Sequence, residues 1–421
     1  MGAKTAEQFV SEVLAALQPL PPLSFPISDS FGCVLAEDVV SEDPVPPEDR
    51  AAFDGYAVRA VDVAGASPES PVKLAVIADV GAGSATVEAI RSSQATRISA
   101  GGPMPAETDL VIPREATDGG VATVHVRADG APGAGVRRAG SDCLAGQRLA
   151  HAGEPVTVTR VQLLAALGRR RVFVHPKPRV VVISVAPERE SSRGEVSGGE
   201  GVAAHGLAAA VREAGGGAHP AGVATDSPHE LGTFVEDHLI RADVLVVTAG
   251  MDHCVPDIVR NAVSGLGDVS FAQVTMTPGG ELGFGFIGPE KVPVFCVPGD
   301  PVASTVAFEL AVRPAIRRLA AAAHVDRPRL SARCSGAIDK AEGVLAVLPA
   351  QAAWTGEEWQ VTPLAGDTVR LADLAAANAL IEVPASTTRV GVGDRVRVML
   401  TDESAAVLPL VPAPREAALP S

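Results

Sequence analysis

Three turns rich in glycine and proline, close together in the second half of the chain, decide the fold: VTAGMDHCVPD (Val247–Asp257), VTMTPGGELGFG (Val274–Gly285) and VPGDP (Val297–Pro301). The first and third of these turns end the apolar runs ADVLVVTAG and VPVFCVPG, and the run PRVVVISVA precedes them in the chain. Such runs are typical of strands that are buried on both faces of a sheet. Because helical patterns separate the runs, the sequence predicts parallel βαβ units in a three-layer α/β domain over residues 178–325.

Other parts of the chain have different patterns. Thr5 and Gln8 form a capping box at the start of a helix that should end by Pro19. Short alternating runs broken by glycine and proline predict a β-rich domain at 51–137. A turn-rich segment then leads into a helix at about 157–167. Alternation after residue 326 predicts a small β-barrel or sandwich that ends near residue 408, and the Pro- and Ala-rich tail, 409–421, should be loose.

Composition excludes several classes of protein. A chain of 421 residues is too long for one compact core, so we expect several domains. The net charge of −15 argues against a surface that binds nucleic acid or anionic membranes in general. We expect no membrane span, because every apolar run of about twenty residues contains charges. The N-terminus lacks the apolar core of a signal peptide, and the five scattered cysteines are typical of reduced thiols in a cytoplasmic protein.

Polar residues gather where the predicted strands end. Open parallel sheets bind ligands at the carboxyl ends of their strands, which here are Ser184–Glu188, Thr248–Asp257 and Pro298–Pro301. Asp300 is a suitable N-cap for the helix that follows it, and a helix N-terminus favours anions. The alternative is that these segments are ordinary strand-to-helix turns. His253 and Cys254 lack a second pair of ligands at the spacing of a zinc site.

Five carboxylates in turn-like sequence are candidate site residues. If they converge on one cleft, they can hold Mg²⁺ together with water; otherwise each is a cap or turn residue. The residues are Asp54, Asp142, Glu188, Asp226 and Asp257.

Several motifs together resemble the MoeA/gephyrin E-domain family. They include PVPPEDRAAFDGYAV (residues 44–58), RISAGGPMPAETDLVIPRE (97–115), AGSDCLAGQRLAHAG (139–153), VVVISVAPE (180–188) and VPGDPVAS (297–304). The resemblance spans nearly the whole chain. It implies an elongated homodimer whose active cleft lies between domains of opposite subunits. Each subunit would have an elongated dimerisation domain (1–50 plus 138–177), a β-rich inserted domain (51–137), a MoaB/MogA-like α/β domain (178–325) and a C-terminal β-barrel (326–408).

The same resemblance implies an activity and a set of site residues. The family inserts molybdenum from molybdate into adenylylated molybdopterin, so the resemblance implies that this chain is a transferase of molybdenum cofactor biosynthesis. The catalytic set carried over by position is Asp54, Asp142, Glu188, Asp226 and Asp257, and Mg²⁺ would be held by Glu188, Asp226 and Asp257. The residues expected to bind the pterin substrate and molybdate are Ser184, Thr248, Gly250, Pro278, Gly279, Pro298, Gly299 and Asp300.

This chain departs from the family motifs where anions should bind. Asp252 replaces a serine, and Gly198-Gly199-Glu200 replaces a DSN motif. Thr277 and Gly280 replace two lysines, and Glu281 and Asp300 add carboxylates. All these charge changes disfavour an anion, at about 1–4 kcal/mol for each pair of unit charges in a partly dehydrated cleft. Arg189 and Arg193 are near in sequence and are candidates to compensate.

Three functions therefore stay open. The first is a molybdenum-insertion enzyme with a rearranged pocket. The second is a catalytically degenerate dimeric scaffold that binds a protein partner, as gephyrin does. The third is a related enzyme that has changed to a less anionic substrate.

Overall fold

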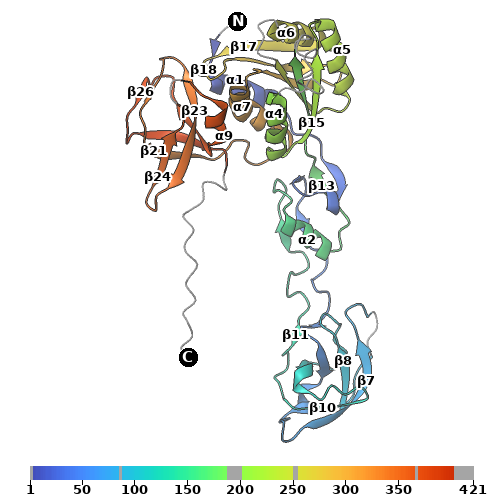
Figure 1. Cartoon of the computed structure of the whole chain (residues 1–421). Coiled ribbons are helices and arrows are strands. Elements are labelled where there is room, and N and C mark those ends of the chain that lie inside the picture. The colour runs from blue at the N-terminus through green and yellow to red at the C-terminus, as the bar shows by residue number, and fades with distance from the viewer. Residues whose placement is uncertain (1–2, 85–87, 187–201, 250–254, 366–367, 403–421) are drawn as a thin grey trace.

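The computed structural model describes residues 3–84, 88–186, 202–249, 255–365 and 368–402. An α/β domain and a β-barrel lie side by side at one end of the molecule (Figure 1). A narrow connector leads from the α/β domain to a small β-rich domain at the other end, which we call the distal domain. No helix among the described residues is long and apolar enough to cross a membrane.

The α/β domain is built on a seven-stranded sheet with the order β1-β17-β19-β20-β16-β14-β15. The central strands β15, β14, β16 and β20 are parallel, whereas β19 runs antiparallel to both β20 and β17. The strands are β14 (Arg179–Ala186), β15 (Gly217–Ala224), β16 (Val244–Ala249), β17 (Gly267–Val274), β19 (Glu281–Ile287) and β20 (Val292–Val297). The prediction of a mostly parallel sheet is confirmed, but the antiparallel strands β17 and β19 were not predicted.

Side chains of β14 alternate between two hydrophobic cores. Val180 and Val182 lie in the core on one face of the sheet, and Val181, Ile183 and Val185 lie in the core on the other. Helices α4 (Val202–Glu213), α7 (Pro301–Ala307), the π-helix at 308–312 and α8 (Arg313–Leu319) cover the first face. Helices α5 (Pro228–Leu239) and α6 (Val255–Leu266) cover the second. A strand buried on both faces has no polar face, which explains the continuous apolar run in its sequence.

The N-terminal helix forms as predicted, but it packs on the α/β domain and not in the elongated domain. Helix α1 (Ala6–Ala16) begins with the reciprocal Thr5–Gln8 capping box. Its buried residues Phe9 and Val13 belong to the core of the α/β domain, and β1 (Ala3–Lys4) pairs with β17. The assignment of residues 1–50 to the elongated domain is therefore wrong for this first segment, because the apolar face of α1 finds its partner on the sheet.

The connector and the distal domain have small cores of their own. The connector pairs β13 (Arg171–His175) with β2 (Leu23–Pro26) and β3 (Val34–Leu35), and α2 (Val158–Ala166) packs beside them. Further short pairs join β4 (Val39–Val40) to β12 (Arg148–Ala150) and β5 (Arg50–Ala51) to β11 (Val136–Arg137). The distal sheet contains β6 (Gly55–Val58), β7 (Val72–Val80), β8 (Gln94–Ile98), β9 (Leu110–Pro113) and β10 (Thr123–Val126).

The C-terminal strands close into a barrel because β23 pairs with both β24 and β25. The strands are β21 (Arg329–Cys334), β23 (Leu345–Trp354), β24 (Trp359–Pro363), β25 (Ala379–Val383) and β27 (Arg395–Leu400). Trp354 and Trp359 face each other across the hairpin between β23 and β24, with ring centroids 5.9 Å apart. The short strand β18 (Met276–Thr277) extends from the α/β domain and pairs with β23. Helix α9 (Leu371–Ala375) lies on the barrel.

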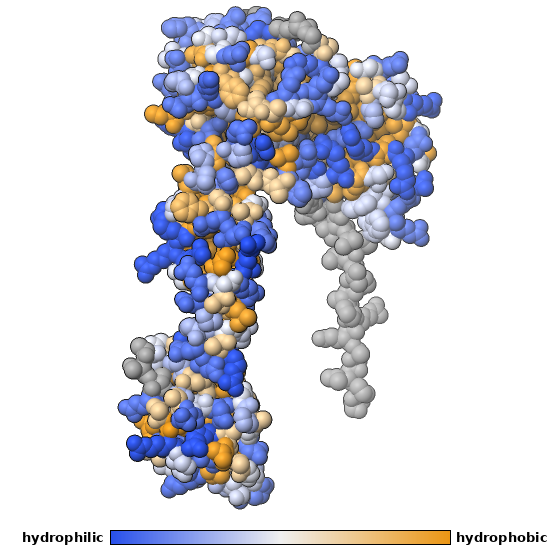
Figure 2. Space-filling model, turned by 180° about the vertical axis from the view of Figure 1, so that it is seen from behind, coloured by the Kyte–Doolittle hydropathy of each residue, from blue (hydrophilic) through white to orange (hydrophobic). Residues whose placement is uncertain are grey.

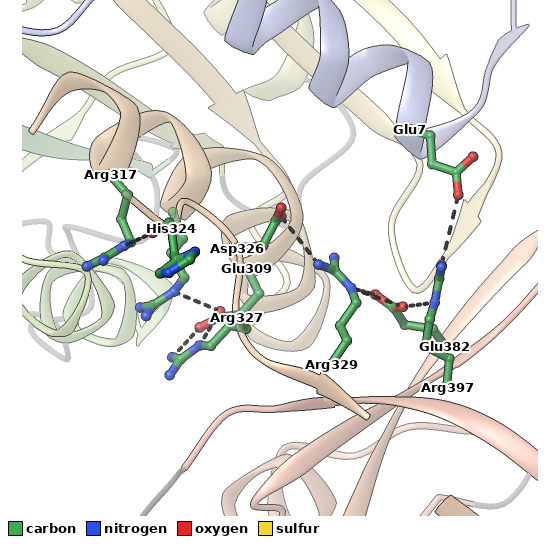
Figure 3. Close-up of polar contacts among 10 residues, drawn as sticks. Glu7, Glu309, Arg317, His324, Asp326, Arg327, Arg329, Glu382 and Arg397 are labelled. Atoms are coloured by element: carbon green, nitrogen blue, oxygen red, sulfur yellow. Dashed lines mark hydrogen bonds and ion pairs between the residues drawn. The ribbon is translucent and has the colours of Figure 1, made fainter. Parts of the chain in front are cut away.

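Charged residues cluster where the barrel meets the α/β domain, and we call this region the junction (Figure 3). Glu382 is 2% exposed, and its carboxylate accepts from Arg329 at 3.2 Å and pairs with Arg397 at 2.5 Å. Arg397 also approaches Glu7 of α1 at 3.9 Å. Burying a carboxylate is costly unless it is paired, so Arg329 and Arg397 stabilise Glu382 inside the barrel. Of these contacts, only the one between Arg397 and Glu7 reaches the α/β domain.

Candidate active site

The parallel strands of the α/β domain end together, and we call this side of the sheet the carboxyl edge. Ser184 of β14 lies opposite Thr248 of β16, and Thr248 lies opposite Val297 of β20. Both hydroxyl residues are buried, and Thr248 Oγ1 donates a hydrogen bond to the carbonyl oxygen of Pro298 at 3.0 Å. The predicted association of the three strand ends is confirmed.

A ligand crevice is expected between β14 and β16. From β14 the chain crosses through α4 to β15, and from β16 it crosses through α6 to β17 on the other side of the sheet. The two helices lie on opposite faces. Adjacent strands whose connections diverge in this way leave a crevice outside their carboxyl ends. Ser184 and Thr248 lie at that position.

The turn after β20 contains a carboxylate, Asp300, that caps the helix following the turn. Asp300 caps α7, and its Oδ1 accepts from the backbone N–H of Ala303 at 2.8 Å, as the sequence predicted. An N-terminal N–H that is already bound to Asp300 is not available to an anion. Asp300 is exposed, and its carboxylate also adds negative charge at this end of the helix.

The loop that carries Pro278 and Gly279 meets this turn. A Cβ on Gly279 would lie 2.9 Å from Ala303 Cβ and 3.4 Å from Pro298 Cγ, and the residue has φ of +73°. This close approach and backbone conformation require glycine. The contact brings Pro278, Gly279, Pro298 and Gly299 together at the carboxyl edge.

Gly280 has little room for a side chain. A Cβ at this position would lie 2.6 Å from Gln273 Nε2 and 2.9 Å from the carbonyl oxygen of Val274. The backbone of Val274 is fixed in turn, because its N–H donates to Gly280 O. The loop has therefore closed around a residue without a side chain. Thr277, in contrast, is exposed.

Two of the predicted carboxylates lie in the turns around the carboxyl edge. Asp226 follows β15 and precedes Ser227, the N-cap of α5, and Asp257 lies in the first turn of α6. Both carboxylates are exposed. Five further predicted residues fall outside the described residues: Glu188, Arg189, Arg193, Gly250 and Asp252.

A single chain does not bring Asp54 and Asp142 to this edge. Asp54 lies in the distal domain, where its Oδ1 accepts from the backbone N–H of Ala100 at 2.7 Å. Asp142 lies in the connector and forms an ion pair with Arg137. Figure 1 shows the distal domain at the opposite end of the molecule from the α/β domain. The five carboxylates therefore do not converge within one chain.

The described ranges contain no group of three or more His, Cys, Asp or Glu side chains that could hold a metal ion. Asp226 and Asp257 have the hard oxygen donors that Mg²⁺ prefers, but a site needs further ligands. His253 and Cys254 lie outside the described residues.

Sequence reasoning missed Arg260. This residue of α6 forms an ion pair with Glu281, the first residue of β19, and its guanidinium lies 4.4 Å from the ring centroid of Phe271. Glu281 therefore does not add an uncompensated negative charge. No local motif marks the pair, because its members are twenty-one positions apart along the chain. The spacing of Arg260 three residues after Asp257 was the available signal.

Cys296 is not a nucleophile in this structure. It lies on β20 beneath the edge, and burial raises the pKa of its thiol to about 12, an effect that the charge of Arg260 only partly opposes. A thiol with such a pKa stays protonated at neutral pH. The other described cysteines, Cys33, Cys143 and Cys334, are also buried and free.

A cavity of about 830 Å³ lies at the junction, away from the carboxyl edge. Leu14, Leu310 and Leu345 contribute apolar surface to it. Two of its three arginines, Arg329 and Arg397, are paired with Glu382, and Arg318 also lines it. Its size alone does not make it the better candidate, because the sheet topology and the converging loops point to the carboxyl edge.

Comparison with known proteins places the whole chain in one group. Residues 4–168 match the MoeA N-terminal region (domain I and II), residues 195–318 match a probable molybdopterin binding domain, and residues 331–401 match the MoeA C-terminal region (domain IV). The chain is 36% identical to molybdopterin molybdenumtransferase 1 of Mycobacterium tuberculosis, over 94% of this chain and 98% of that protein.

Two further relatives match this chain over nearly its whole length. Molybdopterin molybdenumtransferase 2 of Mycobacterium tuberculosis is 33% identical over 93% of this chain and 97% of its own length. The crystal structure of the molybdopterin biosynthesis MoeA protein from Pyrococcus horikosii superposes with a TM-score of 0.72 at 28% identity. That match covers 95% of this chain and 100% of the Pyrococcus chain.

Proposed function

The chain belongs to the MoeA family, and we propose that it is a molybdopterin molybdenumtransferase of molybdenum cofactor biosynthesis. The substrates would be adenylylated molybdopterin and molybdate. The observation that carries the proposal is the full-length match to proteins that are named for this activity. The crevice between β14 and β16 supports it, because ligands of open α/β sheets bind at such a position.

Groups of this chain suit the two substrates. The hydroxyls of Ser184 and Thr248 and the backbone of the Pro298–Gly299 turn supply polar contacts at the crevice. The exposed carboxylates of Asp226 and Asp257 would hold Mg²⁺ together with further ligands, Glu188 among them by the family resemblance. A bound Mg²⁺ would offset the negative charge of the phosphate groups. The residues of the chain would then align molybdate with the pterin dithiolene.

We infer that the functional unit is a homodimer. Asp54 and Asp142 lie far from the carboxyl edge in one chain, so a second chain would have to bring them there. The connector carries large exposed apolar side chains, Leu23, Phe31 and Phe173. Figure 2 shows apolar surface on the connector. Apolar surface of this kind often marks a protein interface. Light scattering should give the mass of a dimer at micromolar concentration, and Phe31→Asp with Phe173→Asp should weaken that dimer; a monomeric wild type would contradict the inference.

A second candidate function is that of a related enzyme that acts on a less anionic substrate. Gly280 has no room for a lysine, and Asp300 occupies an N–H of the helix end. Both features disfavour an oxyanion in the position that the family resemblance implies. A dimeric scaffold for a protein partner remains the third candidate.

One assay tests the main proposal. Purified protein is incubated with adenylylated molybdopterin, molybdate and Mg²⁺, and formation of the molybdenum cofactor is followed by reconstitution of a molybdoenzyme. Molybdopterin molybdenumtransferase 1 of Mycobacterium tuberculosis provides the positive control. We expect transfer by the wild type and a clear loss in Thr248→Val. The matched change Thr362→Val, at an exposed barrel position, should have no effect. No transfer by the wild type beside an active control would refute the proposal.

A further inference from the structure

An ion pair connects helix α6 to the loop at the carboxyl edge. Arg260 Nη2 donates to Glu281 Oε1. The guanidinium also lies over the ring of Phe271, whose centroid is 4.4 Å away. The Arg260 side chain is 26% exposed and that of Glu281 is 47% exposed. Both charged groups are therefore reached by solvent, unlike the buried pairs of the junction.

The position of this pair is set by the sheet. Glu281 directly follows Gly280, and β19 lies next to β20, with Gly283 opposite Cys296. Glu281 is thus close to the level at which β20 ends and the Pro298–Asp300 turn begins. Arg260 is three residues after Asp257 on α6, which places the two on neighbouring positions of the helix surface. The pair therefore connects the helix that carries Asp257 to the strand that directly follows the loop.

The chemistry of Arg260 suits an oxyanion. A guanidinium is always charged, and its planar set of donors matches carboxylate, phosphate and similar anions. The contact with the Phe271 ring, 4.4 Å away, holds the guanidinium in place beside β17. In the structure Glu281 takes up this charge. A half-exposed ion pair contributes little to stability, so an incoming anion can compete with Glu281 at small cost.

We propose that Arg260 is an anion-binding residue of this site and that Glu281 regulates its availability. The inference rests on the proposed function, because it supposes that molybdate enters beside the Thr277–Gly280 loop. Where the family resemblance implies lysines within that loop, this chain places a cation on the neighbouring helix. Glu281 competes with the oxyanion for that cation and lowers its affinity.

Calorimetry with molybdate alone tests the proposal. Glu281→Gln should raise the affinity for molybdate about fivefold, since it removes the competing charge but keeps a side chain of the same shape. Arg260→Met should lower the affinity, and in Arg260→Met the change Glu281→Gln should give no gain. The gain should shrink as salt rises, because ions screen the attraction. Glu358→Gln is the matched control, since it removes one carboxylate of an exposed ion pair in the barrel.

The outcomes separate this inference from the proposed function. If Glu281→Gln and Arg260→Met change thermal stability but leave molybdate affinity within twofold of wild type, the pair is structural and the inference is wrong. Binding too weak to measure in all variants would also overturn it. If the affinity changes as expected but no variant transfers molybdenum, the anion site stands and the transferase proposal fails.

Discussion

The junction and the carboxyl edge handle their charges in opposite ways. At the junction, Glu309 is buried and accepts two hydrogen bonds from Arg327, both at 2.9 Å (Figure 3). At the carboxyl edge, Asp226 and Asp257 are exposed, and Glu281 shares a half-exposed pair with Arg260. The charged groups at the junction are thus paired with other groups of the chain, whereas carboxylates at the carboxyl edge are exposed to solvent.

The difference separates structural charges from candidate functional ones. A buried ion pair is costly to break, because one partner is left desolvated and uncompensated. An exposed charge is already solvated, and it can exchange water for a substrate or a metal ion. Changes at the junction should therefore affect stability, and changes at the edge should affect ligand affinity.

The largest expected effect comes from Arg327→Met. This change leaves the buried carboxylate of Glu309 with only Arg313 nearby, at 3.9 Å, and should cost about 3 kcal/mol of unfolding free energy. Urea denaturation followed by tryptophan fluorescence measures the cost, because the chain's two tryptophans both lie in the barrel. Adding Glu309→Leu removes the orphaned carboxylate but also takes the nearest carboxylate from the buried Arg313, so it should recover only part of the loss. Unchanged stability in Arg327→Met would show that the junction charges are not structural.

A lysine in the loop should strengthen anion binding, but at one of the two positions only. Thr277 is exposed, and Thr277→Lys should raise molybdate affinity about tenfold at low salt. Gly280→Lys should give no such gain, because its Cβ would lie 2.9 Å from the carbonyl oxygen of Val274. Calorimetry at two salt concentrations measures both variants. Equal gains would mean that the loop adapts and that charge alone was missing.

Asp300 contributes to both stability and charge, and two variants separate these effects. Asp300→Asn keeps a side chain that can cap α7 and removes the negative charge, so molybdate affinity should rise while stability stays near wild type. Asp300→Ala also loses the cap and should cost about 1 kcal/mol. Thermal unfolding and molybdate calorimetry on the two proteins check this. An Asp300→Asn protein that binds molybdate no better than wild type would place the anion elsewhere.

The smallest effect is expected for a partly exposed pair at the opposite ends of the parallel strands. Arg179 Nη2 lies 2.7 Å from Asp243 Oδ1, and the Arg179 side chain is half exposed. Arg179→Met should change the unfolding free energy by about 0–1 kcal/mol and leave molybdate affinity unchanged. Urea denaturation and calorimetry again provide the measurements. A loss comparable to that of Arg327→Met would remove the distinction between buried and exposed pairs.

Local sequence patterns were sufficient to predict a feature where the residues that stabilise it are close together in the chain. The apolar run at 180–185 predicts a strand buried on both faces, and the structure places its side chains in two cores. The Thr5–Gln8 box and the Asp300 cap predict helix starts, because each needs only groups within three residues. The strand ends at Ser184, Thr248 and Pro298 follow from the same patterns together with the rule for parallel sheets.

Other features depended on contacts between distant segments. Tyr56 is fully buried in the distal domain, and its hydroxyl donates to the carbonyl oxygen of Gly120, sixty-four positions away in the chain, at 2.9 Å. Strand β17 (GDVSFAQV) was missed because it mixes polar and apolar residues and is partly exposed. Strand β19 (ELGFGFI) was missed because glycines interrupt its apolar residues, although most of it is buried. The Arg260–Glu281 pair brings together two segments with no common motif.

By itself, the sequence determined the starts of α1 and α7, the parallel core of the α/β domain and the family, because these depend on periodicity, capping and motifs that are local in the chain. Only the tertiary structure decided that α1 belongs to the α/β domain, that Gly280 has no room for a lysine, and that Arg260 compensates Glu281. It also placed Asp54 far from the carboxyl edge of its own chain. The physical reason is that steric space, charge pairing and burial are properties of neighbours in space, and the chain brings those neighbours together only when it folds.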